Sequence, residues 1–247
     1  MKTLAFVQAR TGSTRLPGKV LAPLAGRPSL LRIVDRLARV ETLHGVAVLT
    51  SVAAGDDAIA ELCAREGVTC VRGDEQDVLG RFHLGAGALE PDRVVRVTAD
   101  CPLVDPEVIA DLLALHASDP RTVYASVATG AIGAETGLRR FPDGLDAEVF
   151  TVAALEQAWR EADDPYEREH VTPYLWRRPE RFPAATLECE RDLGSERWTV
   201  DHAADLELVR AVYAQLAEPF GWREVLAVLE RDPSLRRLNA AHRAHPT

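Results

Sequence analysis

The sequence is poor in cysteine, and the few cysteines show no functional spacing. A chain of 247 residues holds four of them, and none belongs to a C-x-x-C pair. This spacing argues against a disulfide-rich scaffold and predicts reduced thiols, as in an intracellular protein. The seven histidines lack the spacing of a zinc site as well. The cysteines are Cys63, Cys70, Cys101 and Cys189.

Long apolar runs are also missing. No stretch reaches the roughly 20 apolar residues that a membrane-spanning helix needs. The apolar run at residues 4–7 has the length of a strand and is too short for the core of a signal peptide. We therefore expect a cytoplasmic protein that does not bind a membrane.

Positive charge is in short supply. The chain has 29 lysine and arginine residues against 38 aspartate and glutamate residues, which gives a formal net charge of −9. A surface with this balance does not favour duplex nucleic acid or anionic lipid. A site for a phosphorylated ligand must therefore be local, built from a few cations and backbone amides.

Hydrophobic residues make up 47% of the chain. In its first half, short apolar runs of strand length alternate with helix-like patterns. The strands are continuous Val- and Leu-rich runs, typical of strands buried on both faces. The alternation predicts an α/β fold, a three-layer αβα arrangement with a mostly parallel, Rossmann-like sheet whose ligands bind beyond the carboxyl ends of the strands. The expected strands are 4–9, 46–50, 68–72 and 93–99, and the expected helices are 30–39, 56–65, 76–88 and 106–116.

The pattern is less regular in the second half of the chain. Residues from about 122 to 190 are rich in Gly, Pro and charge, and predict an insertion lobe or dimer arm within a single domain spanning 1–247. After it we expect a short strand at 197–200 and helices at 203–216 and 222–230.

The loop after the first strand, residues 8–19, combines two glycines with three cations. Glycines let the backbone approach a ligand closely, and successive amides can form a nest for an anion. It is not a Walker A loop, because five residues separate Gly12 from Gly18 and Val20 replaces the Ser or Thr. The loop predicts a triphosphate site, and an ordinary surface loop is the alternative. The cations are Arg10, Arg15 and Lys19.

Two carboxylates follow predicted strands. Asp100 ends the strand at 93–99, and Asp201 follows the strand at 197–200 and opens a helix. Hard carboxylates from two strands are a common way to hold Mg²⁺ against phosphate oxygens. For Asp201 a plain helix N-cap is the alternative. Asp105 precedes Pro106, a strong helix start, and is expected to be structural.

Several segments resemble one known family. They are VQARTGSTRLPGKVL (7–21), RG (72–73) with DVL (77–79), RVTADCPL (96–103), PDGLD (142–146) with EVF (148–150), REHVTPY (168–174) and TVD (199–201). In this order they resemble the spore-coat polysaccharide cytidylyltransferase-like family, which is related to CMP-KDO synthetases and acylneuraminate cytidylyltransferases. One departure is that Thr98-Ala99 precede Asp100, where CMP-KDO synthetases have a Gln-Gly-Asp pattern.

The resemblance implies a role for each matching residue. Magnesium, for which manganese can substitute, would be held by Asp100 and Asp201, and these two would act in catalysis with Lys19 and Arg15. The triphosphate would be bound by Arg10, Gly12, Ser13, Arg15 and Lys19, and the nucleoside by Gln8 and Ala9 through their backbone and by Thr50, Ser51 and Arg72. The acceptor would face Asp146, Glu148, Glu169 and His170, the last two opening a helix-like run at 171–176.

Some of these acceptor residues also have a purely structural interpretation. His170 is equally consistent with a structural histidine that Glu169 orients. Asp143-Gly144 is typical of a turn, and Glu148 of a solvated strand residue.

The activity that follows is a cytidylyltransferase reaction. An acceptor oxygen would attack the α-phosphorus of CTP and pyrophosphate would leave. The acceptor would be small and anionic: a sugar acid, a phosphonate or a sugar phosphate. The resemblance also implies a homodimer. The alternatives are a glycosyltransferase, which would normally carry a D-x-D motif where this chain has Asp100-Cys101-Pro102, and a non-catalytic nucleotide-binding protein.

Overall fold

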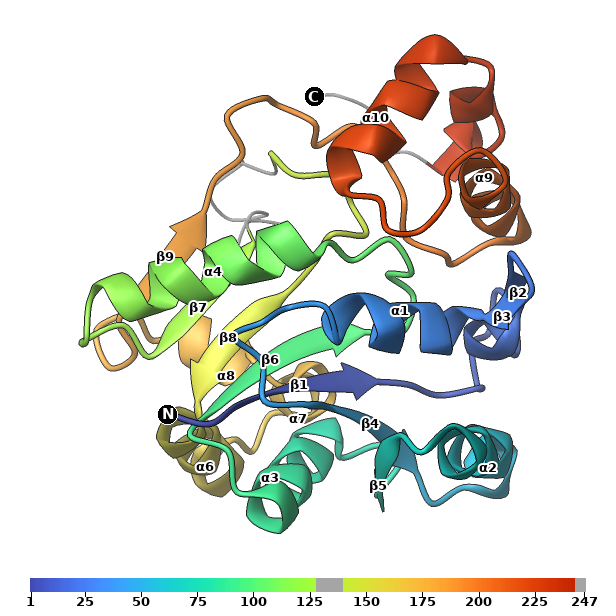
Figure 1. Ribbon diagram of the computed structural model, residues 1–247. Helices are drawn as coiled ribbons and strands as arrows, with labels where there is room; N and C mark the ends of the chain where they lie inside the picture. The colour runs from blue at the N-terminus through green and yellow to red at the C-terminus, as the bar shows by residue number, and fades with distance from the viewer. Residues whose placement is uncertain (128–139, 243–247) are drawn as a thin grey trace.

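The computed structural model describes residues 1–127 and 140–242, and its centre is a seven-stranded sheet (Figure 1). The strand order is β5-β4-β1-β6-β8-β7-β9. All pairings are parallel except those of β8, which runs antiparallel to both of its neighbours. The predicted fold class is confirmed. The strands are β1 (Thr3–Gln8), β4 (Val46–Ser51), β5 (Thr69–Gly73), β6 (Arg93–Thr98), β7 (Tyr124–Val127), β8 (Glu148–Thr151) and β9 (Ala184–Leu187), and a separate hairpin pairs β2 (Pro23–Leu24) with β3 (Arg27–Pro28).

Helices cover both faces of the sheet, each over its own apolar core. In Figure 1, α1 and α4 lie on one side of the sheet and α3 and α6 on the other. The larger core cluster takes side chains from α1, α2, α4, α9 and α10, and the smaller from α3, α6 and α8. The helices are α1 (Ser29–Leu37), α2 (Asp57–Glu66), α3 (Val78–Leu89), α4 (Pro106–Ser118), α6 (Val152–Glu161), α7 (Pro165–His170), α8 (Pro173–Trp176), α9 (Ala203–Tyr213) and α10 (Trp222–Arg231). Within the described ranges, no helix has the length and apolarity needed to cross a membrane.

Asp105 shows how the sequence starts a helix. Its Oδ1 accepts hydrogen bonds from the backbone N–H groups of Glu107 (2.8 Å) and Val108 (3.2 Å), and Pro106 takes the first helical position. These bonds satisfy donors that the first turn of α4 leaves without a helical partner. Its Oδ2 accepts from Trp222 N–H at 2.6 Å, so the same carboxylate anchors the start of α10. The structural role expected for Asp105 is confirmed.

The middle of the chain is more regular than its composition suggests. Where it is described, the range 122–190 supplies β7, β8 and β9 to the main sheet and α6, α7 and α8 to its lower face in Figure 1. The expected insertion lobe is therefore largely an extension of the same sheet. Residues 128–139 of that range lie outside the described residues.

The prediction of a strand at 197–200 is wrong. This segment forms an isolated bridge between Asp143 and Arg197. The carbonyl of Asp143 accepts from Trp198 N–H (2.6 Å) and Thr199 N–H (3.0 Å), and Val200 N–H donates to the carbonyl of Asp100 (2.8 Å). The apolar residues of the segment are buried, but its hydrogen bonds join two loops and do not extend the sheet.

Candidate active site

The loop after β1 is held in place by Asp56. Its Oδ1 accepts from both the N–H (2.7 Å) and the hydroxyl (2.8 Å) of Thr11. The carbonyl of Thr11 in turn accepts from Ser13 N–H (2.8 Å) and Gly18 N–H (3.0 Å). Gly18 has a φ of 71°, a left-handed conformation that favours glycine. The loop thus closes on itself and delivers Lys19 at the start of a short 3-10 turn.

Lys19 joins two carboxylates that are distant in sequence. Its Nζ lies 3.3 Å from Asp100 Oδ2 and 2.9 Å from Asp201 Oδ1. Only 11% of the lysine side chain is exposed. Burial lowers the pKa of Lys19, but the two carboxylates outweigh burial and leave the pKa above its usual 10.5. The structure therefore brings together three residues that the sequence singled out for phosphate and metal.

Arg197 orients Asp201 from the other side and was missed by the sequence analysis. One guanidinium nitrogen donates to Asp201 Oδ2 at 2.8 Å, and the others reach Asp143 Oδ2 (2.8 Å) and Asp205 Oδ1 (3.2 Å). Burial raises the pKa of Asp201, but Lys19 and Arg197 outweigh burial and lower it below its usual 3.8. No local pattern indicates this role, because Arg197 and Asp201 precede α9 in an irregular segment, where a spacing of four residues does not by itself place two side chains together.

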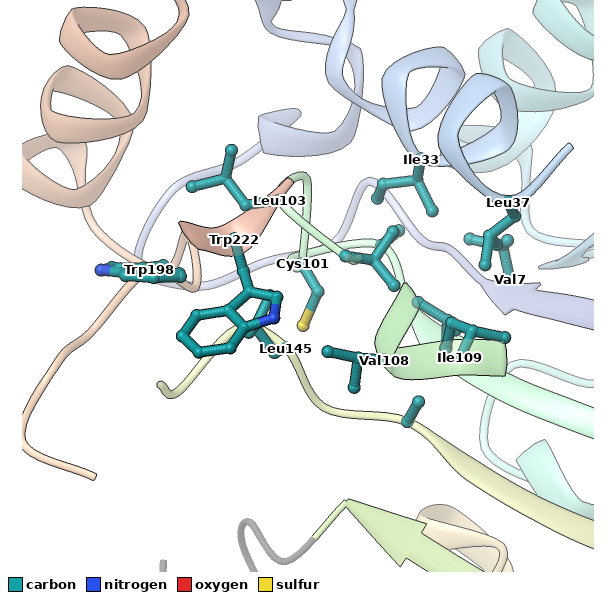
Figure 2. Close-up of a cluster of buried hydrophobic side chains, with 14 of the residues drawn as sticks. Val7, Ile33, Leu37, Cys101, Leu103, Val108, Ile109, Leu145, Trp198 and Trp222 are labelled. Atoms are coloured by element: carbon teal, nitrogen blue, oxygen red, sulfur yellow. The ribbon is translucent and has the colours of Figure 1, made fainter. Parts of the chain in front are cut away.

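Large apolar side chains support the two carboxylate-bearing loops. Figure 2 shows Trp198, Trp222, Cys101 and Leu103 in one buried cluster, to which Cys101 and Leu103 come from the turn that follows β6. Trp198 is 1% exposed although it lies three residues before Asp201. Because packed side chains resist displacement, this core fixes the separation of Asp100 and Asp201.

A cavity of about 230 Å³ opens between the loop and the two aspartates. It brings together eight of the predicted nucleotide and metal residues, and Thr14, Val20, Thr98 and Ala99 complete its lining. The eight are Gln8, Arg10, Gly12, Ser13, Arg15, Lys19, Asp100 and Asp201.

A second cavity, of about 260 Å³, shares Thr98 with the first. Three of the four predicted acceptor residues line it: Asp146, Glu148 and His170. Glu148 is not a solvated strand residue, because it accepts hydrogen bonds from Tyr124 Oη (2.6 Å) and Thr172 Oγ1 (2.6 Å) and pairs with Arg96. Arg96 also donates to Gln8 Oε1 at 3.1 Å, which links the two cavities.

His170 lies at the end of α7 and does not open a helix. Val171 has a φ of 73°, which ends α7, and α8 begins only at Pro173. The helix-like run expected at 171–176 is therefore too long. Burial is the main cause that lowers the pKa of His170; Glu169 raises the pKa, and Arg96 lowers it. The direction favours a neutral imidazole at pH 7.

Glu169 is separated from the other predicted acceptor residues. It lines a third, wider cavity of about 810 Å³, together with Arg10 and the acidic loop at residues 74–77. Arg10 is common to this groove and the cavity around Lys19.

The remaining predicted nucleoside residues lie outside these cavities. Thr50 and Ser51 are fully buried, and Ser51 Oγ donates to Asp56 Oδ2, the carboxylate that holds Thr11. Ala9 is 1% exposed and its N–H pairs with the carbonyl of Leu49. Arg72 donates to the carbonyls of Ser51 and Ala53 and to Asp57. These residues therefore support the loop after β1 from the side away from the cavity around Lys19.

The donor set at Asp100 and Asp201 suits magnesium. Their oxygens converge on one cation, the ammonium of Lys19. Among the described residues no group of three or more His, Cys, Asp or Glu side chains could hold a metal. Mg²⁺ is commonly held by one or two carboxylates with the remaining positions taken by water and substrate phosphates. Two carboxylates beside the loop that is predicted to bind phosphate therefore fit this ion.

Comparisons with known proteins identify the family of the chain. The sequence profile of the cytidylyltransferase family matches residues 4–221. SpsF, a spore coat polysaccharide biosynthesis protein of Bacillus subtilis, is 31% identical over 93% of this chain and 95% of its own length. The structure of a cytidylyltransferase from Leptospira borgpetersenii has 31% identity and a TM-score of 0.87, covering 95% of this chain and 96% of that one.

More distant structures share the fold. A CMP:2-keto-3-deoxy-manno-octonic acid synthetase solved with CTP has 21% identity and a TM-score of 0.65, covering 87% of this chain and 99% of that one. Rv0371c of Mycobacterium tuberculosis, solved with manganese, has 15% identity and a TM-score of 0.59, covering 85% of this chain and 99% of that one.

The family profile spans most of the chain, and SpsF and the Leptospira protein match the chain almost end to end. This protein therefore belongs to the cytidylyltransferase family, and the prediction of a CTP-dependent nucleotidyltransferase is confirmed.

Proposed function

We propose that the protein transfers CMP from CTP to a small anionic acceptor and releases pyrophosphate. One observation carries the proposal: the loop after β1, which includes Lys19, and both aspartates line a single cavity, and a second cavity adjoins it at Thr98. A donor and an acceptor bound in these neighbouring cavities would meet near Asp100. The name of SpsF favours an acceptor from polysaccharide biosynthesis.

The residues of the first cavity fit the demands of this reaction. Negative charge builds on pyrophosphate as it leaves, and Lys19, Arg10 and Arg15 would neutralise it. Asp100 and Asp201 would hold magnesium, or manganese in its place. A metal bound there would act as a Lewis acid on the phosphate oxygens. The protein's main contribution is to hold the two substrates in line and to exclude water from them.

The second cavity would take the acceptor. Arg96 provides a cation there, and Asp146, Glu148 and His170 provide hydrogen-bonding groups. The rings of Tyr166 and Trp176 add apolar surface to the lining, which suits a cyclic acceptor. A sugar acid or a sugar phosphate matches this combination better than a short phosphonate. Glu169 would contact the acceptor only if the acceptor reached the groove beside Arg10.

The nucleoside residues divide into two groups under this proposal. Gln8, whose side chain accepts from Arg96, would face the ribose and base from the cavity wall. Ala9, Thr50, Ser51 and Arg72 would act behind it by fixing the end of β1 and the loop.

A pyrophosphate-release screen tests the function. It crosses the four common nucleoside triphosphates with sugar acids, sugar phosphates and phosphonates. We expect release with CTP and one acceptor class, and loss of activity with EDTA.

In the same assay Lys19→Ala should lower turnover by about 10²-fold, since one charge-stabilising donor is lost. A glycosyltransferase would give no pyrophosphate with any pair.

The quaternary structure is a separate expectation. The family resemblance implies a homodimer, which light scattering of the purified protein reads directly. A mass near 27.0 kDa, that of a single chain, would contradict it.

A further inference from the structure

Lys19 takes the place that a metal ion would need. Its ammonium bridges Asp100 Oδ2 (3.3 Å) and Asp201 Oδ1 (2.9 Å), which are the carboxylates expected to hold magnesium. The side chain is 11% exposed, so water screens the contact only weakly. The lysine ammonium and a metal ion would therefore compete for the same carboxylate oxygens.

The two cations exclude one another at this position. Mg²⁺ binds carboxylate oxygens at about 2.0–2.1 Å, closer than an ammonium hydrogen bond, and demands a regular octahedron of ligands. A doubly charged ion placed between these carboxylates would also repel the ammonium at short range. For the metal to bind both aspartates, Lys19 has to leave.

The surroundings allow Lys19 to leave without disturbing Asp201. Arg197 (2.8 Å) and Arg15 (3.4 Å) contact Oδ2, whereas Lys19 contacts Oδ1. The carboxylate therefore keeps its orientation when the lysine departs.

The residue type also suits a displaceable group. Lys2 and Lys19 are the only lysines among the 29 basic residues of the chain. Lysine carries a compact charge on a flexible stem, whereas the planar guanidinium of arginine is the better permanent clamp. The structure uses arginine for the clamp on Asp201 and lysine for the bridge between the two aspartates.

We propose that Lys19 is a built-in competitor of the metal and that the nucleotide relieves this competition. Triphosphate oxygens would give the ammonium new partners, and the vacated carboxylates would then accept the metal. Metal and nucleotide would bind cooperatively, and by linkage each would raise the affinity of the other by the same factor. The nucleotide part of this proposal rests on the proposed function, but the competition itself does not.

Metal binding without nucleotide tests the competition. Mn²⁺ binding is measured by electron paramagnetic resonance on the wild type, Lys19→Met and Lys19→Gln. Both variants should bind Mn²⁺ about tenfold tighter than the wild type or more, since one nearby charge shifts the affinity of a carboxylate for a proton by a comparable factor. Lys19→Arg, which keeps the charge, and Lys2→Met, which lies outside the site, should stay near the wild-type value.

A second substitution locates the effect. Adding Asp100→Asn to Lys19→Met should abolish the gain, because one of the two metal ligands is lost. Equal Mn²⁺ affinity of the wild type and both Lys19 variants, each shown to be folded by circular dichroism, would overturn the competition. This measurement uses no CTP, so its outcome is independent of whether the pyrophosphate screen succeeds.

Lysine-selective ¹³C labelling tests the displacement in the unaltered protein. With two lysines the spectrum holds two ε-methylene signals, and Lys2→Arg assigns them. Magnesium alone should leave the Lys19 signal in place, whereas magnesium with CTP should shift it. A Lys19 signal that stays fixed at saturating magnesium and CTP would overturn the displacement.

Discussion

Arg197 shows how much a single side chain contributes to this site. It spans Asp143, Asp201 and Asp205, three carboxylates from separate parts of the site, and only 14% of it is exposed. Asn239 adds a hydrogen bond to Asp205 Oδ1 at 3.0 Å. Removing the guanidinium would leave three shielded negative charges close together.

The stability of Arg197 variants tests this role. We expect Arg197→Ala to lower the free energy of unfolding by about 3 kcal/mol, since breaking a buried ion pair leaves its partners uncompensated. Arg121, which is 83% exposed and pairs with Asp119, is the matched control, and Arg121→Ala should cost less than about 1 kcal/mol. Urea unfolding provides both values. Equal losses in the two variants would contradict the assigned role.

Glu148 and His170 are the residues on which the acceptor site depends. Glu148→Gln turns an acceptor of three hydrogen bonds into a group that can donate, and His170→Ala removes a ring from the cavity wall. We expect each variant to raise the acceptor KM or lower kcat while CTP affinity stays within about twofold, because contacts to one substrate are lost. Initial-rate kinetics with each substrate varied in turn gives both parameters. Parallel loss of CTP affinity would place these residues elsewhere in the mechanism.

At the scale of elements, regular alternation was easy to predict and irregular connections were not. The strands expected at 4–9 and 93–99 occur as β1 and β6, because short runs dominated by apolar residues are typical of a strand buried in a sheet. Asp105-Pro106 was recognised as a helix start, but Asp164-Pro165, the same signal, was overlooked. It opens α7, with Asp164 Oδ1 accepting from Tyr166 N–H at 2.9 Å.

The parts of the site that sequence could not give depend on tertiary contacts. The loop and both aspartates are visible as local motifs, whereas the fully buried position of Thr50 follows from how β4 packs between β1 and β5. Val171 adopts a positive φ, which is rare for a β-branched residue and which no local sequence pattern predicts. Arg197 was missed because its three partners meet only in the folded chain.

Gly144 tests how the 142–146 turn supports Asp201. Its φ is 110°, and an added Cβ would lie 2.4 Å from Thr199 N, a backbone atom. The turn must therefore move away from residues 198–199, two positions before Asp201. We expect Gly144→Ala to lower the free energy of unfolding by roughly 2 kcal/mol or more, through strain and lost hydrogen bonds, and to reduce turnover.

Gly87 provides the opposite outcome as a control. It lies inside α3, and an added Cβ would meet nothing within 4 Å. Gly87→Ala should stabilise the protein by about 0.5–1 kcal/mol, because alanine is the better helix former. Thermal and urea unfolding should show the two substitutions moving in opposite directions. A stabilising Gly144→Ala would mean that the turn does not approach residues 198–199 so closely.

At the scale of the whole molecule, several shielded carboxylates make the free energy of unfolding depend on pH. Burial raises the pKa of Asp56, but hydrogen bonds from Ser51 and Thr11 outweigh burial and lower it below 3.8. Burial also raises the pKa values of Asp201 and Asp205, but Lys19 and Arg197 outweigh burial at Asp201, and hydrogen bonds from Arg197 and Asn239 outweigh it at Asp205, so that both values are lowered. Asp105 acts with the opposite sign, since burial raises its pKa above 3.8.

Asp56 gives the pH dependence its clearest test. A carboxylate with a depressed folded pKa contributes stability that is fully present above its unfolded pKa, near 3.8, and is lost as pH falls through the folded value. Asp56→Asn, which cannot carry the charge, should destabilise the protein by roughly 2 kcal/mol at pH 7, as expected for hydrogen bonds to a charged group. Below about pH 4 the difference from the wild type should shrink, because the wild-type carboxylate is then also being neutralised. Urea unfolding from pH 3 to pH 7 gives both curves; a difference that stays constant across this range would show that Asp56 holds Thr11 without its charge.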